Sequence, residues 1–298
     1  MEQYLSRSFG KTFHSIRTAQ RKTIAQINLD ISPSTISNFE NGKSDISLNN
    51  FLKLLTAVKI DIDDFFLLYL ADKSDKQRNL FYPTKYFKQL INDLFIRSDP
   101  KMARQQYQIF KQAFEANGQI EDLLIAITIR AIELQLSSKS RLLSDADSQL
   151  IENYLTSKVG WYAFDYQLLM ATAICLPSKS LLCIYQKMLS LRFSLDDDPS
   201  LHIDLVEALS SMAASFIQKS DKARSQKILT ILHALAIPEE ELLLKINITI
   251  LDCVVKIKFE SDSYYLEELS SILSFIKPIA PIFFTQTSDW LKHINIIT

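Results

Sequence analysis

The chain has 298 residues, of which 47% are apolar, and its charge is nearly balanced, with 33 basic and 34 acidic side chains. Its four glycines lie too far apart to form a G-x-G-x-x-G, Walker or G-x-S-x-G motif. The sequence therefore excludes glycine-cradled phosphate or dinucleotide sites and the nucleophile elbow of hydrolases. Because so few glycines allow few sharp reversals, we predict an all-α fold with a sizeable core.

Three cysteines, Cys175, Cys183 and Cys253, lie among apolar neighbours. An odd number of such residues predicts buried thiols in a reducing compartment. The first residues, MEQYLSRSFGKTF, lack the apolar segment of a secretory signal, and no apolar run approaches 18 residues. We therefore expect a cytoplasmic protein that does not span a membrane.

Residues 6–70 divide into five short helical segments, which predict a compact bundle. The first has apolar side chains on one face, at spacings of four, three and three: Phe9, Phe13, Ile16 and Ala19. The second covers residues 23–29, and the third lies within residues 31–43. Ser47 and Asp61 are suitable N-caps for a fourth and a fifth segment.

The third segment carries its own start and stop signals. Ser32 is a suitable N-cap, Pro33 occupies the first helical position, and Gly42 stands where a left-handed residue would end the helix. Its outer positions hold short polar side chains of the kind that reach base edges in a major groove: Ser34, Thr35, Ser37 and Asn38. With residues 23–29, this segment predicts a helix-turn-helix.

Basic side chains near the motif are candidates for contacts with DNA phosphates: Arg17, Arg21, Lys22 and Lys43. Residues 1–45 carry six basic and four acidic side chains, so their net charge is small. We therefore expect one copy to bind DNA weakly and two copies to share one duplex.

The phrase ISPSTISNFENGK, residues 31–43, resembles the second half of the helix-turn-helix in the XRE/Cro–C1 repressor family. This resemblance implies that the four polar residues face bases or phosphates and that Glu40 holds the domain together. Two positions depart from the family pattern. Asp30 stands where many relatives have Gly, and Gln26 stands where a small residue is expected.

The chain also resembles the Rgg/GadR/MutR regulators of Gram-positive bacteria. Residues 32–42, followed by Ser-Asp-Ile-Ser at 44–47, match their characteristic phrase, although Asn38 and Asn41 replace an Arg of many relatives. The resemblance implies one DNA-binding domain, residues 1–70, and a helical remainder. In that group the remainder binds short, often hydrophobic, secreted peptide pheromones in quorum sensing.

Residues 71–82 are predicted to be a linker, and residues 83–298 a right-handed helical-repeat array similar to tetratricopeptide (TPR) proteins. The predicted helices are 83–97, 100–117, 119–137, 144–158, 161–175, 178–194, 200–219, 221–235, 239–260, 262–277 and 281–296. Taken in pairs, the first helices start at intervals close to 40 residues, which is typical of helix-pair solenoids. Stacked pairs create a concave groove that suits an extended peptide. A non-repetitive helical domain is the alternative.

The first helix of each pair normally faces the groove, which nominates polar residues for peptide binding: Arg130, Tyr162, Tyr166, His202, Gln218 and Asn247. An Asn amide pairs with a peptide backbone, and an Arg holds a carboxylate. Ordinary packing or surface exposure is the alternative for each. The last helices are apolar enough to cap the array or to form a dimer surface, through Ile272, Phe275, Ile282, Phe283, Phe284, Trp290 and Leu291.

Catalytic and metal-binding patterns are not evident in the sequence. The four histidines are scattered, and the spacing of Cys175 and Cys183 matches no zinc motif. Residues 196–198 are three aspartates before a proline, which loop solubility and helix capping explain better than acid–base chemistry. We therefore expect neither an enzyme nor a cofactor or metal site.

These features predict a homodimeric transcription regulator that binds an inverted-repeat operator on double-stranded DNA and responds to a short peptide. Two alternatives remain open. The helical domain of a ligand-independent repressor would only dimerise, and a helical scaffold would dock a protein partner without binding DNA.

Overall fold

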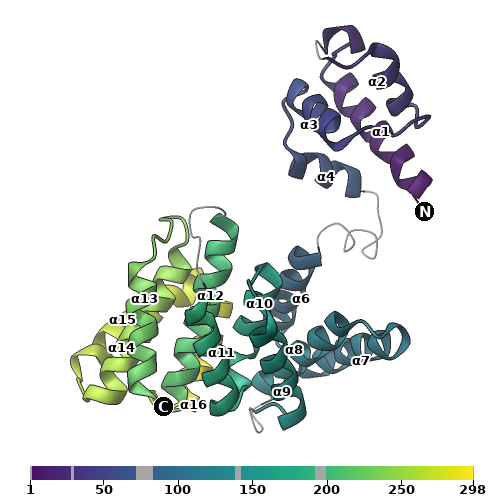
Figure 1. The fold of residues 1–298 in the computed structure, drawn as a ribbon. Coiled ribbons are helices and arrows are strands. Elements are labelled where there is room, and N and C mark those ends of the chain that lie inside the picture. The colour runs from purple at the N-terminus through teal and green to yellow at the C-terminus, as the bar shows by residue number, and fades with distance from the viewer. Residues whose placement is uncertain (1, 28–29, 72–82, 138–141, 192–198, 298) are drawn as a thin grey trace. The chain divides into compact units, whose positions relative to one another are not determined.

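The computed structural model describes residues 2–27, 30–71, 83–137, 142–191 and 199–297, and all regular elements in these ranges are helices. The chain divides into two compact units, Met1–Pro83 and Thr84–Thr298 (Figure 1). The predicted linker beyond Ala71 and the three aspartates at 196–198 lie outside the described residues. The predicted all-α class is confirmed for the ranges above.

The N-terminal unit is a small helical bundle with an aromatic core. Its elements are α1 (Glu2–Ala19), a 3-10 turn η1 (Ile24–Gln26), α2 (Pro33–Glu40), α3 (Leu48–Ala57) and α4 (Ile62–Leu70). Phe13, Phe39 and Phe65 are buried together. Phe51 and Phe65 pack edge to face with ring centroids 4.8 Å apart, an arrangement that aromatic rings favour.

Helix α2 begins and ends as its sequence predicts. The backbone N–H of Thr35 donates to the Ser32 hydroxyl over 3.1 Å, and Pro33 is the first helical residue. Gly42 adopts a φ of 63°, the left-handed conformation that a side chain disfavours. The N-cap, N1 proline and terminating glycine are therefore confirmed.

The predicted helix at residues 23–29 is wrong in extent, because only a single 3-10 turn forms there. A capping box between Thr23 and Gln26 closes the turn, and Ile27 leaves helical geometry with a ψ of 82°. Thr23, Ile24 and Ile27 are β-branched, which lowers helix propensity. Residues 28 and 29 lie outside the described residues. Ala19, expected on the apolar face of α1, is exposed.

Helices α1 and α2 approach each other closely at Gly10. A Cβ atom built on Gly10 would lie 1.9 Å from the carbonyl oxygen of Phe39. That oxygen also accepts a hydrogen bond from the Gly42 N–H, over 2.9 Å, in the turn that ends α2. The absence of a side chain at position 10 thus fixes how α2 lies against α1.

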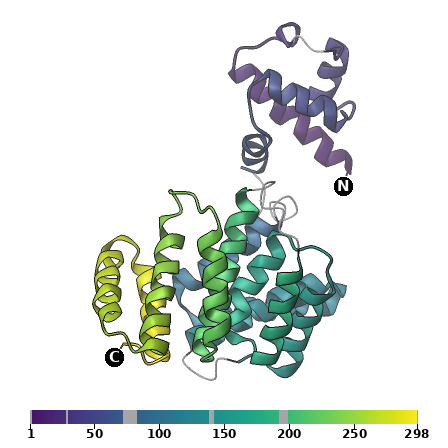
Figure 2. The same ribbon diagram turned by 60° about the vertical axis from the view of Figure 1, so that its left-hand side comes forward.

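The second unit is a stack of α-helices close to the predicted spans (Figure 2). They are α6 (Pro83–Arg97), α7 (Pro100–Asn117), α8 (Ile120–Leu136), α9 (Asp145–Ser157), α10 (Ala163–Thr172), α11 (Ser178–Ser190), α12 (Pro199–Gln218), α13 (Lys222–Ala234), α14 (Leu242–Glu260), α15 (Tyr264–Ile279) and α16 (Pro281–His293). A 3-10 turn, η2 (Ala173–Cys175), extends α10. No helix in the described part of the chain is long and apolar enough to cross a bilayer.

The helices of the second unit form two layers. The first helices of successive pairs begin at residues 83, 120, 163, 199 and 242, so the period close to 40 is confirmed. Helices α8, α10, α12 and α14 pack against one another in that order, and α9 packs against α11 in the other layer. Each pair is therefore buried mainly by its neighbours, as in a solenoid.

Polar side chains join consecutive first helices at their carboxyl ends. The Ser215 hydroxyl of α12 donates to the Ala173 carbonyl over 2.7 Å, and the Lys258 ammonium of α14 donates to the Ile217 carbonyl over 2.7 Å. Carbonyls at the end of a helix lack partners within it, and its dipole favours a cation there. These bonds therefore tie α12 to the end of α10, and α14 to the end of α12.

The last helices both close the array and leave an apolar surface. Leu291 is fully buried, and Trp290 and Ile272 are half-buried against the core. Phe275 and Ile282, in contrast, are exposed. Capping and dimerisation, the two roles expected from the sequence, would thus fall to different residues of α15 and α16.

Replacing Gly10 with Ala should destabilise the N-terminal unit by about 1–3 kcal/mol, because the new methyl group must displace backbone atoms of Phe39. For a unit of this size, each kcal/mol lowers the melting temperature by roughly 4–8 °C, which circular dichroism can follow. Gly160→Ala is the matched control, since its Cβ would meet nothing within 4 Å. Equal melting curves for the two variants would contradict this packing.

Candidate nucleic-acid interface and helical-array residues

The outer face of α2 presents the short polar side chains that the sequence nominated. Ser34 and Asn38 are exposed, and Thr35 and Ser37 are half-buried. The Ser32 hydroxyl is hydrogen-bonded to those of Ser34, at 2.9 Å, and Thr35, at 2.8 Å. The hydroxyls at the start of α2 are therefore held in one cluster.

Asn38 lies in α2 and Asn41 is its C-cap, and their side chains make different contacts. The Asn41 amide donates to the Ser37 carbonyl over 2.7 Å and so caps the end of the helix. The Asn38 side chain is exposed and makes no hydrogen bond to the described residues. Asn38 thus keeps its amide donor and acceptor for a ligand, and this pair matches the N6 and N7 atoms of adenine.

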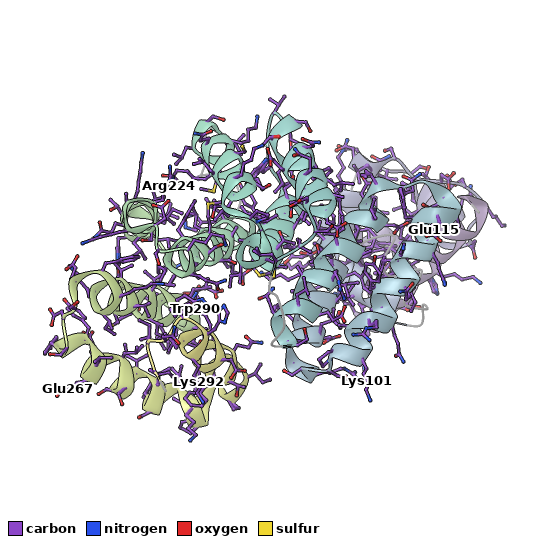
Figure 3. The ribbon with its side chains drawn as sticks, turned by 90° about the horizontal axis from the view of Figure 1, so that it is seen from below. Lys101, Glu115, Arg224, Glu267, Trp290 and Lys292 are labelled. Carbon is purple, nitrogen blue, oxygen red and sulfur yellow. The ribbon has the colours of Figure 1, made fainter. Side chains whose placement is uncertain are left out.

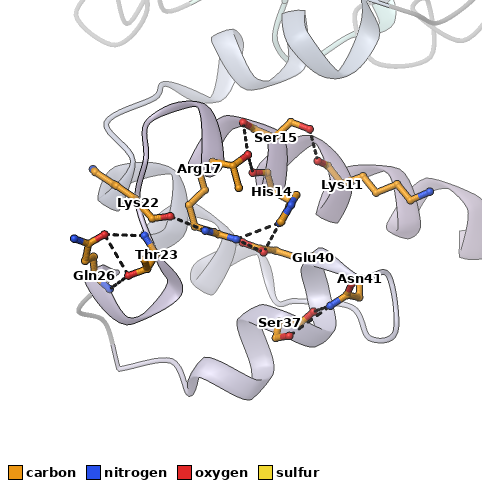
Figure 4. Close-up of polar contacts among 11 residues, drawn as sticks. Lys11, His14, Ser15, Arg17, Lys22, Thr23, Gln26, Ser37, Glu40 and Asn41 are labelled. Atoms are coloured by element: carbon orange, nitrogen blue, oxygen red, sulfur yellow. Dashed lines mark hydrogen bonds and ion pairs between the residues drawn. The ribbon is translucent and has the colours of Figure 1, made fainter.

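Arg17 is not a phosphate contact, and this prediction is wrong. Its guanidinium is buried and binds Glu40 through two bonds of 2.6 Å, as Figure 4 shows. A third bond of 2.6 Å reaches the Lys22 carbonyl, and His14 Nδ1 lies 2.8 Å from the same carboxylate. The ion pair lies inside the bundle, where it joins α1 to α2.

Burial by itself would raise the pKa of the Glu40 carboxyl. The hydrogen bonds from Arg17 and His14 outweigh burial and hold this pKa below its ordinary value of 4.5. The hydrogen bond with Glu40 in turn raises the pKa of Arg17, so both partners remain charged near neutral pH. The pair therefore acts as a fixed buried link.

The other basic candidates differ in exposure. Arg21 and Lys43 are exposed. The Lys22 ammonium is half-buried and donates to the Ala57 carbonyl, at the end of α3, over 2.6 Å. Arg21 and Lys43 therefore remain the better placed candidates for phosphate contacts.

In the helical array, Tyr166 does not lie on a surface, and its nomination for peptide binding is wrong. Its side chain is only 4% exposed and packs edge to face on Trp161, with centroids 5.6 Å apart. Burial raises the pKa of its hydroxyl to about 12. Tyr162 precedes α10 and is exposed.

Four further nominated residues are partly exposed on first helices. Arg130 is paired with the buried carboxylate of Glu133, which also accepts a 2.7 Å bond from Arg104. His202 Nε2 and Gln218 Oε1 are buried atoms without a hydrogen-bond partner among the described residues. Asn247 is half-buried on α14.

The nominated residues do not line either of two surface hollows in the described part of the chain. One, of about 590 Å³, lies between the start of α8 and α9 and includes Ile120, Leu150 and Tyr154. The other, of about 390 Å³, lies where α13 meets α14. Among the described residues, no three His, Cys, Asp or Glu side chains are grouped so as to hold a metal ion.

The sequence analysis missed a polar cluster that joins three helices of the array. Lys88 on α6 binds Asp204 and Glu207 on α12, at 2.9 and 2.8 Å. Gln167 on α10 donates to Asp204 over 3.2 Å. More than a hundred residues separate Lys88 from its partners, so no local pattern could have signalled this cluster.

Comparison with known proteins adds two findings. Residues 16–65 match the helix-turn-helix family model. No curated protein matches the chain.

Several solved structures share the fold along nearly the whole chain. The SHP pheromone receptor Rgg2 of Streptococcus dysgalactiae, in a form with one substitution, superposes with a TM-score of 0.70 at 17% identity, covering 96% of this chain and 99% of its own. A PrgX/cCF10 complex gives a TM-score of 0.70 at 14% identity, covering 97% and 92%. A bacterial peptide pheromone/receptor complex gives 0.69 at 12% identity, covering 98% and 99%.

The N-terminal unit is therefore a helix-turn-helix domain of the class that binds DNA in transcription regulators. The chain as a whole has the fold of Rgg2 and PrgX.

Replacing Glu40 with Gln should destabilise the N-terminal unit by about 3–5 kcal/mol, because it leaves the Arg17 charge buried without a counter-charge. Since the pKa of Glu40 is lowered on folding, the pair stabilises the protein above the ordinary carboxyl pKa. That contribution is lost as the pH falls through the lower folded value. Urea unfolding between about pH 7 and pH 3 measures both effects. A Glu40→Gln variant that is as stable as the unaltered chain would contradict the role of this pair. So would a variant whose stability falls between pH 7 and pH 3 as much as that of the unaltered chain.

Proposed function

We propose that the protein is a DNA-binding transcription regulator that works as a homodimer and is controlled by a short signalling peptide. The observation that carries this proposal is the polar outer face of α2, on a helix-turn-helix bundle in which the inner face of the same helix is apolar and ion-paired. Asn38 is the most informative residue of that face, because its amide is exposed and makes no bond to the described residues.

A dimer is expected from the charge of the domain. Arg21 and Lys43 are exposed, whereas Arg17 is occupied by Glu40. Phosphate contacts supply much of the affinity of such domains, so one copy binds weakly. Two copies related by a two-fold axis would place their α2 helices in major grooves about 34 Å apart, on an inverted-repeat operator.

Control by a peptide is supported by the fold. Among the similar structures, Rgg2 is described as a pheromone receptor, and another is a peptide pheromone/receptor complex. In this chain, Asn247 is partly exposed on the first helix α14, where an amide can pair with a peptide backbone. Gln218, on the first helix α12, has a buried amide oxygen that no described residue satisfies. A peptide alters DNA binding only if it binds one arrangement of the dimer more tightly than another.

Replacing Asn38 with Ala should remove a base contact and leave the fold intact, because the side chain is exposed. We expect affinity for the preferred duplex, selected from a random-sequence library with the full chain, to fall by about 1–3 kcal/mol, or roughly 5–150-fold. Affinity for unrelated DNA should not change. Fluorescence anisotropy at fixed salt measures both.

Asn92→Ala is the matched control for this experiment, since it removes an exposed amide from α6 in the other unit. Full sequence preference in the Asn38 variant would contradict base reading by α2. Absence of any salt-dependent DNA binding by the unaltered chain would contradict the proposal as a whole.

Replacing Gln218 or Asn247 with Ala should weaken peptide binding about tenfold, the effect of losing roughly 1.4 kcal/mol. The probe is a synthetic pool of octapeptides built from Leu, Ile, Val, Phe and Ala, and the readout is the fraction that the immobilised full chain retains. Gln112→Ala, an exposed amide on α7, is the control. Equal retention by all variants would place the peptide elsewhere.

A further inference from the structure

Three helices meet at one polar cluster inside the array, which we call the acidic cluster: Lys88, Gln167, Asp204 and Glu207. The Lys88 ammonium bridges Asp204 Oδ1 and Glu207 Oε2, at 2.9 and 2.8 Å. The other oxygen of Asp204 accepts the Gln167 amide over 3.2 Å. The cluster therefore joins α6, α10 and α12.

The cluster has one more acidic than basic side chain. Two carboxyl groups share a single ammonium, and Glu241 adds further repulsion to Glu207. Burial raises the pKa of Glu207, and the attraction of Lys88 only partly offsets this. The available cation thus leaves the carboxylates incompletely neutralised.

A second, independent feature of the cluster is a buried acceptor without a donor. Gln167 is 3% exposed. Its amide nitrogen donates to Asp204, and its amide oxygen, Oε1, takes no part in that bond. That oxygen is buried and has no hydrogen-bond partner among the described residues. Buried polar atoms of this kind are costly unless a partner reaches them.

Two members of the cluster are buried and two are partly exposed. Asp204 is 6% exposed and Gln167 is 3% exposed. The side chains of Lys88 and Glu207 are 30% and 25% exposed, so a ligand reaches the cluster through them. The Lys88 ammonium is the only cation among the four side chains.

We propose that the acidic cluster binds a primary ammonium group of the peptide ligand, an inference that rests on the peptide control proposed above. An ammonium offers three donors and no acceptor, which suits a site with spare acceptors and excess negative charge. It completes the neutralisation of Asp204 and Glu207 and competes with Lys88 for them. The group is either the peptide amino terminus or a lysine side chain.

The experiment uses four synthetic octapeptide pools and the full chain on a solid support. The pools have a free or an acetylated amino terminus, and each form has either one lysine or a norleucine in its place. We expect the pool without any amine to be retained about tenfold less than the best amine-bearing pool, a difference of roughly 1.4 kcal/mol. Whether the free terminus or the lysine restores retention identifies the source of the ammonium.

Variants of the chain test whether the acidic cluster causes this preference. Glu207→Gln should abolish the preference for amines, because it removes one of the two carboxylates that bind the ammonium. Lys88→Met should increase the preference, because it removes the competing ammonium, whereas a purely structural role would not produce a gain. Glu267→Gln, at the outer edge of the array in Figure 3, is the control and should behave as the unaltered chain. Circular dichroism melting verifies that each variant is folded.

Equal retention of all four pools would overturn the proposal, and so would an unchanged preference in a folded Glu207→Gln variant. In either case peptide control itself would stand, since peptides would still bind. If no pool were retained, both this inference and peptide control would fail, whereas DNA binding through Asn38 is measured separately.

Discussion

The buried ion pair between Arg17 and Glu40 is the constraint on which the candidate nucleic-acid interface depends. It links α1 to the last residue of α2, while the missing side chain of Gly10 lets the same two helices approach closely. Together they fix the orientation of α2, so its polar face remains outside. Because Arg17 is bound to Glu40, it is not available to DNA phosphates, and this supports the proposed dimer.

Local signals in the sequence were sufficient for much of the fold. Ser32, Pro33 and Gly42 determine the limits of α2 through capping and backbone geometry alone, and prolines and helix periodicity give the limits of most array helices. Burial was harder to anticipate. Arg17 and Tyr166 look like surface residues within their own helices, but each is covered by partners from other segments. The acidic cluster joins residues far apart in the chain, so only the folded array brings them together.

The helical array is well packed, but it also contains buried polar atoms without hydrogen-bond partners among the described residues. Consecutive repeats are joined by apolar packing and by bonds such as that from Lys258 to the Ile217 carbonyl. Against this background, the acidic cluster combines an excess of carboxylates over ammonium groups with the oxygen of Gln167, one of several buried polar atoms without a partner among the described residues. Protein interiors rarely contain buried polar groups without hydrogen-bond partners. The proposed ligand would supply the missing donors.

Hydrogen–deuterium exchange of the full chain, with and without its selected duplex, tests the central claim most directly, because it locates the DNA on the protein. The account predicts slower exchange for residues 33–43, which comprise α2 and the turn that follows, when the duplex is added. Exchange that is unchanged in this segment, with protection confined to the helical array, would contradict it.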